Sequence, residues 1–301
     1  MTNKNNHCIS VCILTYKRPA MLDRCLQELQ NQQRGKFNFS IVVVDNDSNQ
    51  SAKAIVDDWR KRSSVEIHYH VESEQNISLA RNKAVANSSG DLIAFIDDDE
   101  FPENTWLNNL YLTWVSTTSD GVLGPVIPHF AIKPPQWLTK SGLLERTSFI
   151  TGMVLKAEYT RTGNLLFDRK ILDGDESPFD PQFGRSGGED SDFFRRMIGK
   201  GHVFVWCNEA NVYETVPLER FTRTYLIKRA LLRGVSEARL RSIPRREVLK
   251  SLVACHLYTF ALPFLLFLGH HLFMKYLIKD CDHIGKLLAK YGIEIIKERD
   301  F

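Results

Sequence analysis

The sequence predicts an α/β fold with a mostly parallel central sheet covered by helices on both faces, followed by a basic and apolar helical tail. In the first half, short apolar runs alternate with segments whose apolar residues recur at helical spacing, a pattern typical of parallel strands buried on both sides. Farther on, basic residues crowd positions 220–250 and an apolar run fills 252–278. With 301 residues, 43% of them hydrophobic, the chain can bury one large core and carry an appendage.

The elements expected in the first half follow one another as strand and helix. The expected strands cover residues 9–15, 40–44, 65–71, 92–96 and 121–127. The expected helices begin at Pro19, run over 52–59 and 77–87, and follow Pro102. In the second half, 193–199 is expected to be helical, 202–206 a strand, and the glycine-rich 173–188 a loop.

Polar residues follow three of the expected strands where each strand ends. They are Thr15–Tyr16, Asp45–Asn46 and Asp97–Asp98–Asp99. Because ligands of open parallel sheets bind beyond the carboxyl ends of the strands, we expect these side chains to border one site. Thr15, Asp45 and Asn46 offer donors and acceptors suited to a base and ribose, although Asp45 and Asn46 could equally make only a turn.

The run Asp97–Asp98–Asp99 suggests a divalent cation site. Three adjacent carboxylates repel one another, and Mg²⁺ and Mn²⁺ prefer carboxylate and phosphate oxygens. A cation bridging a diphosphate would neutralise a leaving group. The alternative is a solvated acidic turn or a helix cap, since Pro102 follows closely.

Glu189–Asp190 forms a second acidic cluster, and a carboxylate there could act as general base toward a hydroxyl nucleophile. The alternative is a cap of the helix that follows, because acids are favoured at helix N-termini. Arg81 lies between two of the predicted loops, where its guanidinium could contact phosphate or nucleotide. The alternative is that Arg81 is an ordinary surface arginine without a role in binding.

The sequence lacks the motifs that are typical of several other kinds of site. Neither a GxGxxG nor a GxxxxGK[ST] motif is present, which argues against dinucleotide-fold and P-loop chemistry. The six cysteines are scattered without a close CxxC pair, so neither a zinc site nor a disulfide framework is indicated. The polar first seven residues lack a signal segment, and we expect a reducing, cytoplasmic location.

Five segments together resemble the family-two glycosyltransferases, in that family's order and over about residues 9–220. Those segments are ISVCILTYKRP at 9–19, VVVDNDS at 42–48, NISLARN at 76–82 with GDLIAFIDDDEFP at 90–102, TG at 151–152 with GNLLF at 163–167, and FD at 179–180 with GGEDSD at 187–192. The resemblance implies a GT-A fold and an inverting, hexosyltransferase-type reaction that displaces a nucleotide directly. A segment around Glu214 and Arg220 resembles the exopolysaccharide (succinoglycan-type) branch; Arg220 could reach the diphosphate or could equally be an ordinary surface arginine.

The resemblance also implies roles for individual residues. Asp97 and Asp99 would bind Mn²⁺ or Mg²⁺, Asp98 would contact ribose or metal, and Asp190 would be the base, with Glu189 as the alternative base. The implied nucleotide-sugar contacts are Thr15, Tyr16, Arg18, Asp45, Asn46, Arg81, Asp97 and Asp98. Asn46 stands where many relatives carry Asp, which leaves a base other than uracil open. The QxxRW motif of processive polymerases is absent, so transfer of one sugar is expected.

The implied organisation is a catalytic domain at 1–219 and a tail at 220–301. Residues 8–127 would bind the nucleotide sugar, most simply a UDP-sugar, and 128–219 would face the acceptor, a lipid-linked or lipopolysaccharide glycan. We expect no nucleic-acid partner.

Two alternative functions remain open. The first is a sugar-nucleotide nucleotidyltransferase, which would need a glycine-rich loop that is absent from 9–24. The second is a non-catalytic glycan-binding scaffold of the same fold, which the intact acidic clusters argue against.

The tail is expected to meet the inner face of the cytoplasmic membrane. Only Glu237 and Glu247 oppose its basic residues between 220 and 250: Arg220, Arg223, Lys228, Arg229, Arg233, Arg239, Arg241, Arg245, Arg246 and Lys250. Such a charge pattern suits an anionic lipid surface. Residues 252–278 are long enough to span, but histidines, Lys275 and Pro263 interrupt them, which favours a helical hairpin or interfacial helices. The alternative is packing on the catalytic domain or in a dimer.

Overall fold

The structure is a computed structural model that describes residues 7–33, 35–175, 177–240 and 244–293. Arg241 of the basic tail and the first six residues of the polar N-terminus lie outside this range. Contacts divide the chain into a first unit, residues 1–127, 146–184 and 189–214, and a second unit, residues 128–145, 185–188 and 215–301.

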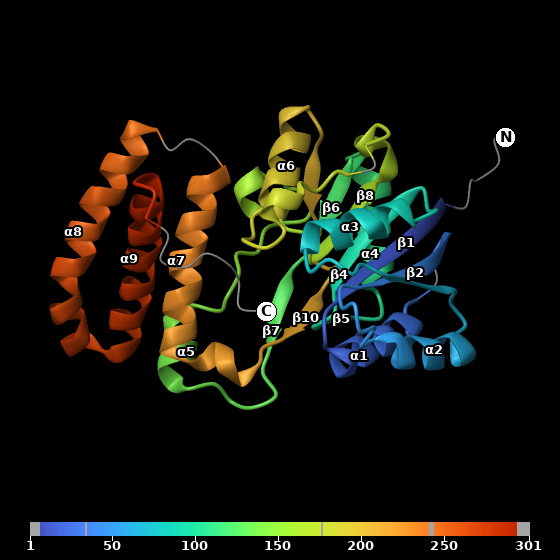
Figure 1. The fold of residues 1–301 in the computed structure, drawn as a ribbon, viewed down its shortest axis with the longest axis horizontal. Helices are drawn as coiled ribbons and strands as arrows, with labels where there is room; N and C mark the ends of the chain where they lie inside the picture. Colours follow the sequence, from blue (N-terminus) through green and yellow to red (C-terminus); the bar gives the residue numbers. More distant parts are fainter. Residues whose placement is uncertain (1–6, 34, 176, 241–243, 294–301) are drawn as a thin grey trace. The chain divides into compact units, whose positions relative to one another are not determined.

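A seven-stranded sheet with the order β3-β2-β1-β4-β8-β6-β9 forms the centre of the first unit (Figure 1). Its strands are β1 (His7–Thr15), β2 (Phe37–Asp45), β3 (Ile67–Val71), β4 (Leu92–Asp97), β6 (Gly121–Leu123), β8 (Asn164–Asp168) and β9 (Phe204–Trp206). All neighbours pair in parallel except β8, which is antiparallel to β4 and β6. The expected mostly parallel sheet is therefore confirmed, although β8 was not predicted.

Both faces of this sheet are buried because alternate residues of each strand enter different cores. In β1, Ile9, Val11 and Ile13 join one cluster with residues of α1 (Pro19–Gln30), α2 (Lys53–Arg62) and α4 (Trp106–Thr117). Cys12 and Leu14 join the other cluster with residues of α3 (Ile77–Ala86) and α6 (Glu189–Gly199). This two-sided burial explains why the strands are continuously apolar in sequence.

Local signals account for the helix positions. Pro19 occupies the first turn of α1, where its missing N–H costs nothing. The α1 face that enters the core carries Leu22, Cys25, Leu26 and Leu29, at helical spacing. Short 3₁₀ helices complete the unit: η1 (Ala157–Tyr159), η2 (Arg169–Leu172) and η3 (Pro181–Phe183).

The single strand expected over 121–127 was wrong. The chain instead makes β6, then leaves the large sheet at Gly124–Pro125 and enters a second sheet as β7 (Val126–His129). That sheet has the order β5-β10-β7, with β5 at Glu100–Pro102 and β10 at Val212–Thr215. Pro125 cannot donate to a ladder, and a Cβ on Gly124 would lie 2.4 Å from the Ala210 carbonyl oxygen, so only glycine fits this exit.

The second unit is helical. It contains α5 (Gln136–Ser141), η4 (Leu218–Phe221), α7 (Arg223–Leu240), α8 (Arg245–Leu268) and α9 (His270–Lys290). The helix α9 packs against α5, α7 and α8, with Leu226, Met274 and Ile278 in the shared core. The apolar run of the tail divides at Gly269, whose φ of 145° favours glycine, while Pro263 remains inside α8.

We predict that Asn164→Ala destabilises the first unit. Asn164 is 1% exposed; its Oδ1 accepts from Trp106 Nε1 at 2.8 Å, and its Nδ2 donates to the carbonyls of Pro125 and Ala210 at 2.9 and 2.7 Å. Alanine would leave three buried partners unsatisfied, which should cost about 3 kcal/mol or more. The midpoint of urea unfolding would measure this loss of stability. The control is Asn87→Ala, which removes only an exposed hydrogen bond from the Asn87 side-chain amide to the Lys83 carbonyl and should change the midpoint little. Equal midpoints for the two variants would contradict the prediction.

Candidate active site

The carboxyl ends of three adjacent strands bring the first group of predicted site residues to one edge of the large sheet. Thr15 is the register partner of Asp45 across β1 and β2. Leu14, one residue earlier, is the partner of Asp97 across β1 and β4. The strand ends expected to border one site therefore do lie side by side.

The side chains of Thr15 and Arg18 lie close to Asp98 and Asp99. The Thr15 hydroxyl donates to Asp98 Oδ2 at 2.8 Å, and Arg18 Nη1 lies 3.4 Å from Asp98 Oδ1 and 3.5 Å from Asp99 Oδ2. Both carboxylates are buried, whereas the Arg18 side chain is 45% exposed. Burial raises the pKa of Asp98 to about 6, against the opposing effect of Arg18 and the Thr15 hydrogen bond.

Arg81 joins the two acidic clusters. It lies on α3, is 4% exposed, and its Nη1 is 2.6 Å from Oε1 of Glu189, itself 1% exposed. Burial lowers the pKa of the guanidinium, but Glu189, Asp97 and Asp190 outweigh that effect and raise it above its ordinary value. Carboxylates more than ninety positions apart in sequence thus act on the charge of one buried cation. Arg81 Nε is a buried donor with no hydrogen-bond acceptor among the described residues.

Three further charged side chains border Asp97, and sequence reasoning gave none of them a role there. Burial raises the pKa of Asp97, as do Glu214 and Glu189, while Arg81 and Arg146 lower it. Arg146 Nη2 donates to Glu214 Oε2. Glu100 Oε2 accepts from the Asp97 backbone N–H at 3.1 Å. Glu100 directly follows the acidic run and could have been included, but Arg146 is a lone basic residue without a local pattern.

Burial of Glu100 raises its pKa well above the ordinary value, and Asp97 and Asp99 add to the effect. Gly163 leaves room for this crowding. A Cβ there would lie 2.8 Å from Glu100 Oε1 and 3.0 Å from Asp97 Oδ2. Asp97, Asp99 and Glu100 are therefore crowded together, and carboxylates are a donor set that suits a hard cation.

Glu189 and Asp190 occupy the first turn of α6, as the capping alternative expected, yet they differ in surroundings. Gly187 and Gly188 precede them with φ of 84° and 106°, values that favour glycine and let the chain turn sharply into the helix. Glu189 points into the buried pair with Arg81. Asp190 is only partly buried, and its Oδ1 accepts from the Ser191 N–H at 2.7 Å.

Asp45 and Asn46 make many bonds within the protein. Asp45 accepts from the Ala52 N–H at 2.8 Å and the Tyr69 hydroxyl at 2.9 Å. Asn46 Nδ2 donates to the carbonyls of Glu72 and Glu74, and its Oδ1 accepts from the Asn76 N–H at 3.0 Å. An aspartate at 46 could not donate these bonds, which explains the amide at this position. Tyr16 follows β1 directly and is partly buried.

The predicted site residues thus form two connected groups of the first unit. One contains Asp97, Arg81, Glu189 and Asp190, and the other contains Thr15, Arg18, Asp98 and Asp99. Asp97 lies next to Asp98 in the chain, and its charge raises the pKa of Asp98. Asp45 and Asn46 border the same edge of the sheet and tie it to the start of α3. Arg220 belongs to η4 of the second unit.

Comparison with known sequences places this geometry in a family. The model of Glycosyl transferase family 2 matches residues 10–173, more than half of the chain. Succinoglycan biosynthesis protein ExoM of Rhizobium meliloti (strain 1021) is 34% identical over 242 residues, which cover 80% of this chain and 77% of that relative.

Comparison with solved structures addresses the fold. S. aureus TarS 1-349 in complex with UDP-GlcNAc aligns over 96% of this chain and 93% of that chain, with a TM-score of 0.55 and 16% identity. Mannosyltransferase PcManGT from Pyrobaculum calidifontis, in complex with GDP-Man and Mn²⁺, aligns over 81% and 67%, with a TM-score of 0.58 and 18% identity. The expected GT-A fold is confirmed. The chain belongs to Glycosyl transferase family 2 and is a glycosyltransferase.

Proposed function

We propose that this protein transfers a single sugar from a nucleotide-diphosphate sugar to a glycan acceptor, with inversion at the anomeric centre and a divalent cation. The observation that carries the proposal is the Arg81 guanidinium, which contacts Glu189 at 2.6 Å and whose pKa is raised by Asp97 and Asp190 as well. One acidic cluster is then available to a cation and diphosphate, and the other to the attacking hydroxyl.

Asp97 and Asp99 are the proposed ligands of Mn²⁺ or Mg²⁺. Within the described part of the chain, no group of three or more His, Cys, Asp or Glu side chains is arranged to hold a metal ion by itself. That agrees with a hard cation that takes one or two carboxylates and completes its shell with substrate phosphates and water. Burial raises the pKa of Asp97, so a cation beside it would offset that cost. The chemistry that a bound cation supplies is neutralisation of the departing diphosphate.

Asp190 is the proposed general base, in preference to the alternative base Glu189, which is held in an ion pair with Arg81. A base must be reachable by the acceptor hydroxyl, and Asp190 is partly buried whereas Glu189 is 1% exposed. The Glu189 carboxylate is also engaged with Arg81 at 2.6 Å, so one of its oxygens already has a partner. In the proposed step, Asp190 takes the proton of the acceptor hydroxyl as the hydroxyl oxygen attacks the anomeric carbon and the nucleoside diphosphate departs.

The proposed donor is a UDP-sugar, bound with the help of Thr15, Tyr16, Arg18, Asp45, Asn46, Arg81, Asp97 and Asp98. The proposed acceptor is a lipid-linked or lipopolysaccharide glycan in cell-surface polysaccharide assembly, a role supported by the name of the succinoglycan relative. Residues 1–219 would carry out the transfer. Residues 220–301 would hold the enzyme peripherally at the cytoplasmic face of the membrane.

Asp99→Asn should weaken metal-dependent donor binding. Removing a ligand charge should lower the affinity by at least about tenfold, since even outer-shell changes at metal sites reach that range. Thermal shift with UDP-sugars and Mn²⁺, followed by calorimetric titration, would measure it, because ligand binding raises the melting temperature. Asp57→Asn on α2, which replaces a carboxylate that is 44% exposed and pairs with Arg60 at 3.7 Å, is the matched control. Equal Mn²⁺-dependent affinity in Asp99→Asn and the wild type would remove Asp99 from the metal site.

Asp190→Asn should keep donor affinity and lose turnover. Loss of a general base costs about 10²–10⁴-fold in rate. Release of nucleoside diphosphate from the donor, with water or a screened sugar as acceptor, gives the rate, and titration of the donor gives the affinity. Undiminished release would show that another group takes the proton.

Glu189→Gln should lower both the free energy of unfolding and the rate of transfer. Breaking a buried ion pair leaves the Arg81 charge uncompensated and should cost about 3–5 kcal/mol. Replacing both partners, in Arg81→Met with Glu189→Met, should restore much of the stability but not the activity. Urea midpoints of the single and double variants would show whether the pair is coupled. Asp190→Asn serves as the matched comparison, with an expected midpoint close to that of the wild type.

A further inference from the structure

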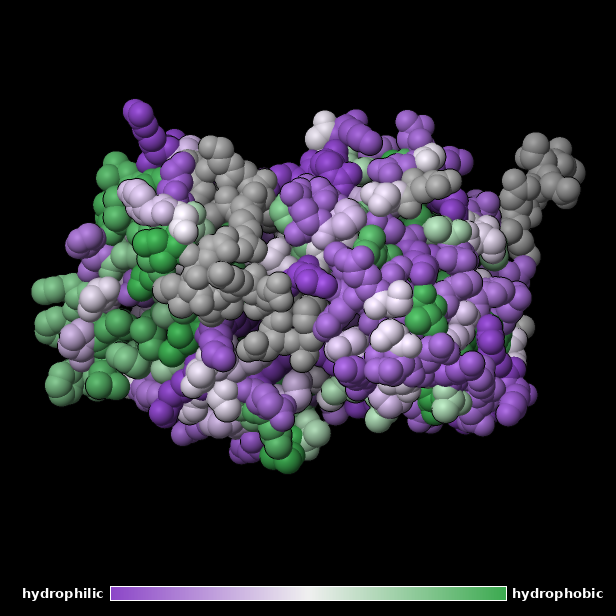
Figure 2. All heavy atoms as spheres, in the orientation of Figure 1, coloured by the Kyte–Doolittle hydropathy of each residue, from purple (hydrophilic) through white to green (hydrophobic). Residues whose placement is uncertain are grey.

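A continuous stripe of exposed apolar side chains runs along α8. It consists of Leu249, Val253, Leu257, Phe260, Phe264 and Phe267, with spacings of three or four residues that place them on one face of the helix. Their exposed fractions run from 51% for Val253 to 90% for Phe267. Figure 2 shows hydrophobic side chains gathered over this helix. Exposed apolar surface of this extent marks an interaction site.

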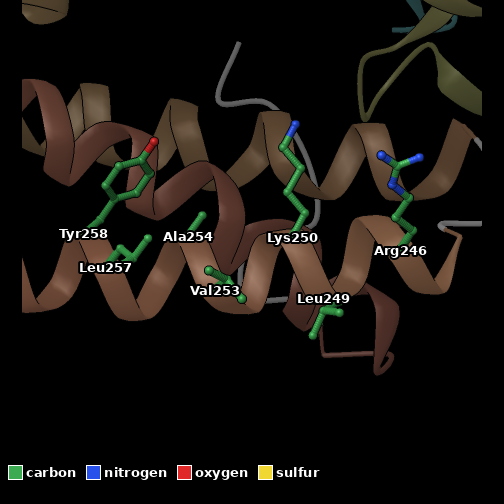
Figure 3. Close-up of a pocket in the computed structure, with 7 residues that line it drawn as sticks. All are labelled: Arg246, Leu249, Lys250, Val253, Ala254, Leu257 and Tyr258. Atoms are coloured by element: carbon green, nitrogen blue, oxygen red, sulfur yellow. The ribbon is translucent and has the colours of Figure 1, made fainter.

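The stripe begins beside positive charge. Arg246 and Lys250 extend from the same side of α8 near its start, next to Leu249 and Val253, and together they line a shallow groove (Figure 3). Arg245 precedes them and is also exposed. The helix is thus polarised along its length, with basic residues at the first turns and three phenylalanines at the end.

We propose that α8 docks on an anionic phospholipid bilayer, lying in the plane of the interface with this stripe among the acyl chains and Arg246 and Lys250 at the lipid phosphates. The stripe supplies apolar area, and the basic residues are complementary to the negative headgroups. The inference deepens the proposed peripheral location. It is independent of the proposed chemistry, because α8 belongs to the second unit and all the proposed catalytic residues belong to the first.

The opposite side of α8 distinguishes this mode from a membrane-spanning one. By length and composition, α8 is the one helix in the described ranges that could cross a membrane. However, Thr259, near its middle, donates to Asp280 Oδ2 of α9 at 2.9 Å, and Asp280 is 3% exposed. A spanning hairpin would carry this carboxylate to the depth of the hydrocarbon, which is costly. In-plane docking keeps Asp280 on the protein side of α8.

Charge also distinguishes lipid from a second copy of the chain. The only acidic residue of α8 is Glu247, in the first turn beside these cations, so an antiparallel second copy would place the apolar end of its α8 against Arg246 and Lys250. A dimer through α8 would therefore bury or crowd these cations without compensation, whereas lipid phosphates would pair with them.

Vesicle binding by the full-length protein tests the proposal. Co-sedimentation would be compared for vesicles of phosphatidylcholine alone and for vesicles that also contain phosphatidylglycerol, over a range of salt concentrations. We expect binding to the anionic vesicles that weakens with salt. Phe260→Glu with Phe264→Glu should reduce the partition coefficient by about tenfold or more, and Arg246→Gln and Lys250→Gln by about fivefold each.

Matched controls separate the stripe from general surface effects. Leu112→Glu replaces an apolar residue of α4 that is 52% exposed, and Lys61→Gln removes an exposed charge of α2; both should bind like the wild type. Circular dichroism and melting temperature check that each variant folds. Metal-dependent release of nucleoside diphosphate, measured without vesicles, should be unchanged in the α8 variants. Failure of that release in the wild type would count against the proposed function and not against the docking surface.

Three results would overturn the inference. The first is equal binding to neutral and anionic vesicles, or binding unaffected by the stripe variants. The second is resistance of the bound protein to extraction with alkaline carbonate, as expected of a spanning segment; an in-plane helix should be released. The third is a vesicle-free dimer, seen by light scattering, that the Phe260→Glu and Phe264→Glu changes dissociate while vesicle binding is absent.

Discussion

One buried guanidinium compensates the acidic clusters of the candidate site. Carboxylates removed from water repel one another and cost several kcal/mol each unless they are compensated. Arg81 lies among Asp97, Glu189 and Asp190 and pairs with Glu189 at 2.6 Å. Without this charge, the end of β4 and the start of α6 would be driven apart. The position of α3, which carries Arg81, therefore decides the geometry of both acidic clusters.

Polar contacts at both of its ends hold α3 in place. Asn76 caps its first turn by accepting from the Ser78 and Leu79 N–H groups, and the Asn76 backbone N–H donates to Asn46 Oδ1. Farther along, Asn82 exchanges hydrogen bonds with the Phe179 backbone. The segment proposed to bind the nucleotide is thus linked through α3 to the segment proposed to activate the acceptor.

The two units satisfy different physical demands. In the first, both faces of the sheet are buried, and its polar residues gather at the strand ends and helix starts, where backbone geometry leaves room for a ligand. In the second, α9 packs against α5, α7 and α8, but the stripe on α8 remains exposed. A helix that is apolar on its outer face requires a partner other than water.

The sequence by itself determined the elements whose signals are local. Continuous apolar runs and 3.6-residue spacing predicted β1, β2, β4, α1 and α2, and polar residues after three strands predicted that their side chains would lie along one edge of the sheet. Tertiary structure alone decided the antiparallel β8, the exit at Gly124–Pro125, the place of Arg146 beside Asp97, and the different surroundings of Glu189 and Asp190. The reason is physical: periodicity records which side of an element is buried, whereas pairing partners, close backbone approaches and neighbouring charges depend on residues distant in the chain.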